Sequence, residues 1–125
     1  MSRVIHFELT VDDPARARAF YEQTLGWKIT QWGDEDYWLV STGEPGTPGI
    51  DGALTTRREN WPALVNIIDV TALDDTVAAV KANGGKVLEG PMPIPGVGYL
   101  AYCQDTEGNV FGMMQADPNA VPMQG

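Results

Sequence analysis

The sequence predicts an α+β fold in which two βαβββ modules follow one another, with curved mixed sheets around a central cleft and the helices outside. Two observations lead to this prediction. The chain opens with an alternating strand and an amphipathic helix, from Val4 to Gly26, and a fainter copy of this stretch begins at Val65. In addition, one offset of 59 residues, the separation of Gly26 and Gly85, aligns landmarks of the two halves.

The first strand is expected at residues 4–11, where apolar and polar side chains alternate. The polar face carries His6, Glu8 and Thr10, and the apolar face carries Ile5, Phe7, Leu9 and Val11. One face therefore enters a core. The other presents two titratable side chains, His6 and Glu8.

A helix follows this strand and ends at Gly26. Asp13 can accept hydrogen bonds from the first backbone N–H groups, and Pro14 suits the first helical position. The side chains expected to face inward recur at helical spacing: Ala17, Phe20, Tyr21, Thr24 and Leu25. Gly26 ends the helix because glycine readily adopts the left-handed cap conformation.

Three more strands complete the first module, at residues 27–31, 37–41 and 50–56. A polar turn joins the first two, and a stretch rich in Gly and Pro, residues 42–49, precedes the third. We assign residues 3–57 to this module and residues 57–62 to a charged linker.

The second module is expected at residues 63–116 and opens with a strand at residues 63–70 that is apolar nearly throughout. A helix follows Thr71, with Asp74 in a capping-box-like position and Gly84-Gly85 as its stop. Its inward side chains are expected to be Leu73, Val77 and Val80.

The rest of this module is predicted as strands at residues 86–89, 99–104 and 110–115, with a second loop rich in Gly and Pro at residues 90–98. An irregular tail, residues 117–125, closes the chain. We interpret residues 1–125 as one domain made of two modules.

The offset of 59 residues pairs positions of like character in several elements: Val11 with Val70, Leu9 with Ile68, Ile29 with Leu88, and Gly49 with Gly108. We interpret the two halves as an internal duplication. A ligand in the cleft is then expected to meet strand faces of both modules. Aromatic side chains on or beside the middle strands would furnish its walls: Trp27, Trp32, Tyr37, Trp38, Tyr99 and Tyr102.

Composition narrows the class of protein. The formal net charge of −9 repels polyanions, so nucleic acid is not expected as a partner. No apolar stretch has the length of a membrane span or a signal segment, so we expect a cytoplasmic protein that contacts no membrane. The single cysteine, Cys103, lies in a predicted strand and is expected to be a buried thiol.

The opening stretch resembles the vicinal oxygen chelate superfamily, which includes glyoxalase I, bleomycin-resistance proteins, fosfomycin-resistance enzymes and extradiol dioxygenases. The resemblance rests on Asp13-Pro14, on Phe20-Tyr21, on Leu25-Gly26-Trp27 and on the final hairpin at residues 105–115. It covers about residues 4–116 and is most similar to the glyoxalase-like bacterial branch of undefined activity. It implies the fold more specifically than any reaction, because such folds host many functions.

Metal-dependent members place ligands at four equivalent positions, one on the first and one on the last strand of each module. In this sequence the resemblance puts them at His6, Ala53, Val65 and Gly112, and only His6 can bind a metal. A catalytic divalent site usually has about three protein ligands. No cofactor is therefore expected, and a divalent metal held through other ligands is the alternative.

Two functions remain open. The first is a small-molecule-binding protein with a metal-free cleft, as in the bleomycin-resistance relatives. The second is a lyase or isomerase, with or without a divalent metal, in which His6 is a general base oriented by Glu8. The alternative for His6 is a hydrogen-bonded cleft or core histidine. The predicted ligand-binding residues are His6, Glu8, Trp38, Asn66, Tyr99 and Gln115. The family resemblance also implies a homodimer.

Overall fold

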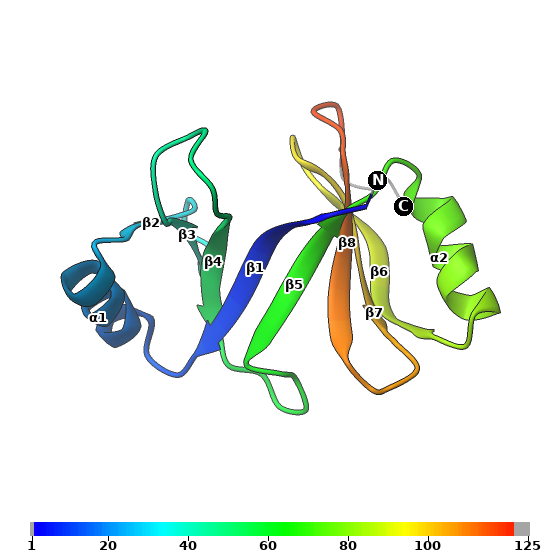
Figure 1. The fold of residues 1–125 in the computed structure, drawn as a ribbon, viewed down its shortest axis with the longest axis horizontal. Coiled ribbons are helices and arrows are strands. Elements are labelled where there is room, and N and C mark those ends of the chain that lie inside the picture. The colour runs from blue at the N-terminus through cyan, green and yellow to red at the C-terminus, as the bar shows by residue number, and fades with distance from the viewer. Residues whose placement is uncertain (1, 122–125) are drawn as a thin grey trace. The chain divides into compact units, whose positions relative to one another are not determined.

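A computed structural model describes residues 2–121 of the chain, and Figure 1 shows the course of its backbone. The described residues form two compact units, residues 5–65 and residues 66–121 together with residues 2–4. The backbone N–H of Asp69 donates to the carbonyl oxygen of Arg3, which joins the start of the chain to the second unit.

The first unit contains one helix and four strands. Its elements are β1 (Val4–Val11), α1 (Pro14–Leu25), β2 (Lys28–Gln31), β3 (Tyr37–Ser41) and β4 (Asp51–Thr56). The strand order is β2-β3-β4-β1. Strand β1 pairs with β4 in parallel, whereas β2–β3 and β3–β4 are antiparallel.

The second unit repeats this arrangement. Its elements are β5 (Leu64–Asp69), α2 (Leu73–Ala82), β6 (Lys86–Ile94), β7 (Gly98–Gln104) and β8 (Val110–Ala116). Here the order is β5-β8-β7-β6, and again the first and last strands pair in parallel. The α+β class and the two βαβββ modules are thus confirmed. The central cleft between the modules and the assignment to one domain remain predictions.

Strand register confirms the offset of 59 residues for the first and last strands of the modules. Leu9 pairs with Leu54 in β1–β4, and Ile68 pairs with Met113 in β5–β8. The alignment of Ile29 with Leu88 was wrong, since Ile29 is 2% exposed and Leu88 is 41% exposed. Helix α2 is shorter than α1, so the sequence after it is displaced relative to the first copy.

The loop predicted at residues 90–98 is mostly strand, because β6 continues to Ile94. The strand reaches this length with irregular register against β7 and with a cis peptide bond between Gly90 and Pro91. Strand β6 is the last in the order of its module. Proline is tolerated at such an edge, since the N–H group it lacks would have no partner strand on the open side.

Helix α2 begins differently from the prediction. Ala72, not Thr71, is the N-cap residue, and it has no side chain that could accept a hydrogen bond. The side-chain oxygen of Gln115 on β8 accepts from the backbone N–H of Leu73 at 2.8 Å instead. Because the partner comes from a distant strand, local spacing could not reveal it.

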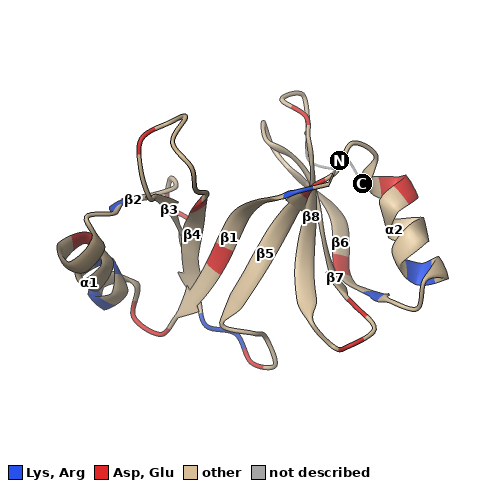
Figure 2. Ribbon diagram, in the orientation of Figure 1, with Lys and Arg blue, Asp and Glu red and all other residues tan. Residues whose placement is uncertain are grey.

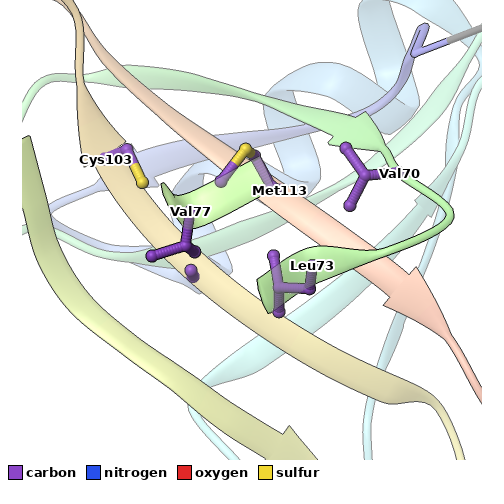
Figure 3. Close-up of a cluster of buried hydrophobic side chains, with 6 residues drawn as sticks. Val70, Leu73, Val77, Cys103 and Met113 are labelled. Carbon is purple, nitrogen blue, oxygen red and sulfur yellow. The ribbon is translucent and has the colours of Figure 1, made fainter. Parts of the chain in front are cut away.

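The core of the second module lies between α2 and its sheet. Helix α2 runs along β6 and β7, as Figure 1 shows. The cluster beneath it, seen in Figure 3, consists of Val70, Leu73, Val77, Ala101, Cys103 and Met113. Cys103 is fully buried, as predicted, and this burial raises the pKa of its thiol.

The core of the first module is formed by Val11, Ile29, Val40 and Leu54. Helix α1 contributes less to it than predicted, since none of its residues is buried. The inward placement of Phe20 and Leu25 was wrong, because these side chains are 57% and 56% exposed. Tyr21 stacks on Trp27, and the Glu22 carboxylate accepts from the backbone N–H of Ile29, so aromatic and polar contacts connect α1 to the sheet.

Charged residues lie mainly in the loops and helices of both units (Figure 2). Within β1 the acidic residue is Glu8, a strand position where a carboxylate is unusual. None of the described helices is long and apolar enough to cross a membrane. The described part of the tail, residues 117–121, contains no helix or strand; residues 122–125 of the predicted tail lie outside the described residues.

Matched truncations should reveal the unequal packing of the two helices. Leu73→Ala in α2 should lower the free energy of unfolding by about 2–5 kcal/mol, because Leu73 is 2% exposed. Leu25→Ala in α1 should change it by only about 0.5 kcal/mol, as for other exposed sites. Urea denaturation of both variants measures the difference, and equal losses would contradict the described packing of α1.

Candidate functional site

The polar side of β1 forms the candidate site. Phe7, Leu9 and Val11 pack in the core beneath α1. Because side chains alternate along a strand, His6, Glu8 and Thr10 lie on the opposite face of the sheet. Glu8 is only 7% exposed and Thr10 only 3%, so this face is largely removed from water.

Tyr37 of β3 connects the two titratable residues. Its hydroxyl donates to Glu8 Oε2 at 2.9 Å, and the same hydroxyl oxygen lies 2.9 Å from His6 Nε2. The His6 and Tyr37 rings are nearly parallel, with an interplanar angle of 10°. Imidazole, phenol and carboxylate thus form one continuous hydrogen-bonded chain.

Tyr37 reaches this position by crossing a strand. Strand β4 lies between β3 and β1, so Tyr37 and Glu8 belong to backbones about 10 Å apart. The β4 residue paired with Glu8 is Ala53, which also pairs with Leu39 of β3. Because alanine ends at Cβ, the sheet face over β4 has room for the tyrosine ring.

Burial and neighbouring charges have opposite effects on the pKa of His6. Burial lowers the pKa of its imidazole below the ordinary value, whereas the negative charges of Glu8 and Asp51 raise it by smaller amounts. Asp51 lies beside His6 on β4, and its carboxylate accepts from the backbone N–H of Thr42 at 2.9 Å. The net effect favours a neutral imidazole at neutral pH.

Thr10 forms hydrogen bonds with backbone carbonyl groups and not with His6. Its hydroxyl donates to the carbonyl oxygen of Ala63 at 3.2 Å and lies 3.4 Å from that of Pro62. The backbone N–H of Thr10 also donates to Ala63 at 2.7 Å. This residue therefore fixes the end of the predicted linker against β1.

The other predicted ligand-binding residues are described within their own units, and their part in a shared site remains a prediction. Trp38 packs against the core beneath α1, on the face opposite His6. In the second unit, Asn66 is exposed on β5 and Tyr99 packs against the core beneath α2. Gln115 accepts the hydrogen bond that starts α2. Within the first unit, His6 and Glu8 are brought together through Tyr37.

Tyr37 and Asp51 are the site residues that the sequence did not single out. Tyr37 was included only among aromatic side chains that could line a cleft. Its role depends on pairing between strands that are distant in sequence, since it lies 31 residues from His6 and 29 from Glu8. The sequence offered one signal for this role: Tyr37 is an aromatic residue with a hydroxyl group, at the start of a predicted strand.

The donor set does not fit the metal site of the family. Ala53 and Val65 are fully buried apolar residues. A Cβ atom at Gly112 would overlap Ile67 Cδ1, so no ligand side chain could stand there without repacking. Among the described residues, no three His, Cys, Asp or Glu side chains are grouped as metal ligands would be.

A shallow hollow of about 350 Å³ lies apart from His6, beside the start of α1. Asp12, Arg16, Phe20 and Arg57 are among its lining residues. Arg57 Nε lies 3.4 Å from Asp12 Oδ1, and both side chains are largely exposed. Such a solvated ion pair contributes little energy, and the hollow lacks the buried polar groups found along β1.

Comparison with known proteins gives a family match over most of the chain. The family described as the Glyoxalase/Bleomycin resistance protein/Dioxygenase superfamily matches residues 3–113. CFP32 of Mycobacterium tuberculosis, whose name groups it with the glyoxylases, is 29% identical over 89% of this chain and 43% of its own length. This chain thus spans less than half the length of that relative. A glyoxylase-like domain-containing protein of Didymella fabae is 29% identical over 85% of this chain and 88% of its own.

Solved structures share the fold at low sequence identity. Methylmalonyl-CoA epimerase in complex with methylmalonyl-CoA and NH4+ superposes with a TM-score of 0.68 at 16% identity, covering 98% of this chain and 99% of that chain. The epimerase of Mycobacterium tuberculosis gives 0.63 at 16% identity, covering 91% and 87%. At these identities the similarity establishes the fold alone.

The charge of Glu8 should be visible in the titration of His6. Since His6 is the only histidine, its ring signals in an NMR titration are unambiguous. We expect a pKa below the ordinary value of about 6.5, and a still lower one in Glu8→Gln, which removes the charge that raises it. Glu107→Gln, in the exposed turn after β7, is the matched control. An unchanged or higher pKa in Glu8→Gln would contradict the described electrostatics.

Stability should also depend on the protonation of His6. Its pKa is lower in the folded chain than in the unfolded chain, so acid favours unfolding. The stability that depends on neutral His6 is fully present above the unfolded pKa of about 6.5 and is lost as pH falls through it toward the folded pKa. Urea denaturation from about pH 7.5 to 5.5 should show this decline. His6→Gln should show a smaller decline, and an equal decline would assign the effect to other groups.

Proposed function

Since the chain belongs to the glyoxalase/bleomycin resistance protein/dioxygenase superfamily, we propose that it binds a small organic molecule at the polar face of β1 without a divalent metal. The hydrogen-bonded chain from His6 through Tyr37 to Glu8 is the observation that carries this proposal. Its three side chains converge on one sheet face, and ligand sites typically present a few fixed polar groups among apolar surroundings.

Charge narrows the class of ligand. Glu8 and Asp51 both act on His6 as negative charges, and no cation is among the causes of its pKa shift. An anionic group placed at His6 would be repelled by these carboxylates. The ligand is therefore a neutral or positively charged molecule that can form hydrogen bonds.

A second candidate function is proton transfer, as in a lyase or isomerase. Its support is the lowered pKa of His6, because a neutral imidazole can accept a proton whereas an imidazolium cannot. Glu8, linked through the Tyr37 hydroxyl, would stabilise the imidazolium formed. Proton transfer requires a molecule bound at His6, as simple binding does, so a binding experiment tests both functions. The homodimer and the cytoplasmic location remain predictions from the sequence.

A thermal-shift screen of neutral and cationic compounds tests the proposal. A ligand present at about 100 times its Kd should stabilise the protein by about 2.7 kcal/mol. The shift should persist after treatment with a chelator and disappear in His6→Ala. Arg16→Ala, in the hollow beside α1, is the control and should retain the shift.

Two results would overturn the proposal. Loss of binding in Arg16→Ala with retention in His6→Ala would move the site to the hollow. Stoichiometric metal in protein purified without chelator, absent from His6→Ala, would contradict the metal-free site. Turnover of a bound compound, lost in His6→Gln, would select the proton-transfer function over simple binding.

A further inference from the structure

We propose that Tyr37 is a positioning residue that keeps the proton of neutral His6 on Nε2, so that Nδ1 is the atom that accepts a hydrogen bond or a proton from the ligand. The proton on Nε2 is a property of the folded chain alone, whereas the role of Nδ1 toward a ligand rests on the function proposed above.

The single hydroxyl proton of Tyr37 decides which nitrogen of His6 is protonated. A tyrosine hydroxyl has a single proton, and in Tyr37 it is donated to Glu8 Oε2 at 2.9 Å. The same oxygen lies 2.9 Å from His6 Nε2 and can only accept there. His6 Nε2 must therefore carry a proton. In the neutral imidazole the other nitrogen, Nδ1, then holds the lone pair.

The opposite arrangement is less favourable. If the Tyr37 hydroxyl donated to His6 Nε2, the Glu8 carboxylate would lose the phenol as a donor. Glu8 is 7% exposed, so water has little access to replace that hydrogen bond. A hydrogen bond to a carboxylate is also roughly twice as strong as one between neutral groups. The Tyr37 hydroxyl therefore donates its proton to the Glu8 carboxylate and not to His6.

Ring orientation follows from the same contacts. The nearly parallel His6 and Tyr37 rings, with centroids 6.5 Å apart, place the hydrogen bond at the edges of the two rings. Trp32 contacts the Tyr37 ring in a T-shaped arrangement, with ring centroids 5.9 Å apart. Tyr37 is thus held by its ring as well as by its hydroxyl, so it can in turn fix the imidazole.

Nδ1 is the nitrogen left for a ligand. In the described part of the chain, the hydrogen bond of the His6 ring is the one to Tyr37 through Nε2. A ligand that donates an N–H or O–H group to Nδ1 would extend the chain of hydrogen bonds to four groups. If its group were acidic enough to release the proton, His6 would become an imidazolium with both nitrogens protonated, and Nε2 would keep its bond to Tyr37.

Nitrogen-15 NMR of the labelled protein tests the arrangement directly, because His6 is the only histidine. Above the pH of its titration, the wild-type ring should give two widely separated nitrogen resonances, with the attached proton on Nε2 and slow exchange of that proton with water. In Tyr37→Phe the resonances should move toward each other and the proton should exchange faster. Tyr21→Phe, which removes a hydroxyl on the α1 side of the sheet, should match the wild type.

Phenol added at increasing concentration serves as a neutral hydrogen-bond donor probe. It should shift the Nδ1 resonance more than the Nε2 resonance in the wild type. A proton on Nδ1 in the wild type, or identical nitrogen spectra and exchange rates in Tyr37→Phe, would overturn the role of Tyr37. If the wild-type ring is protonated on Nε2 but phenol shifts Nε2 alone, the assignment of Nδ1 to the ligand is wrong.

These results separate the two proposals. The tautomer is measured without any ligand, so its outcome does not depend on the function. A screen in which no compound binds would overturn the proposed function and leave the role of Tyr37 in the folded chain standing. Amide spectra of Tyr37→Phe verify that the variant folds.

Discussion

The parallel pairing of the first and last strand in each module is the constraint on which the rest of the structure depends. In the first module it aligns His6 with Asp51 and Glu8 with Ala53. Since side chains on paired strands keep to the same face, this register decides which groups share the side of the sheet opposite α1. A slip of one residue would turn His6 and Glu8 into the core beneath the helix.

Ala53 connects this register to the chemistry of the site. It is fully buried, and it occupies the strand between the one that carries Glu8 and the one that carries Tyr37. The family resemblance puts a metal ligand at this position, where a longer side chain would stand in the path of the tyrosine ring. A metal-ligating side chain at position 53 and the Tyr37 ring that bonds to His6 would therefore occupy the same space.

The two modules share a topology but differ in how their helices are attached. Helix α2 buries Leu73 and Val77 against its sheet, and its first turn is completed by Gln115. Helix α1 buries no residue and is held by contacts of Tyr21 and Glu22. The two modules therefore share strand order and the parallel pairing of their first and last strands, whereas their helix contacts differ. The hydrogen-bonded chain of His6, Tyr37 and Glu8 lies in the module with the less buried helix.

Much of the fold was predictable because local patterns determine it. Alternation over residues 4–11 set the two faces of β1, and Asp13, Pro14 and Gly26 marked the ends of α1, where the structure has them. Structural features that depend on residues distant in sequence were predicted less well. The length of β6 depended on its place at the edge of the sheet, and the exposure of Phe20 depended on how closely α1 packs.

The sequence by itself determined that His6 and Glu8 lie side by side on one polar face, because a strand repeats every two residues. It also determined that three of the four family ligand positions hold residues that cannot bind a metal. Only the tertiary structure decided what His6 and Glu8 contact. The order of β3, β4 and β1, with a small residue in the middle strand, allows Tyr37 to join them, and strand order is a product of long-range pairing that no local pattern encodes.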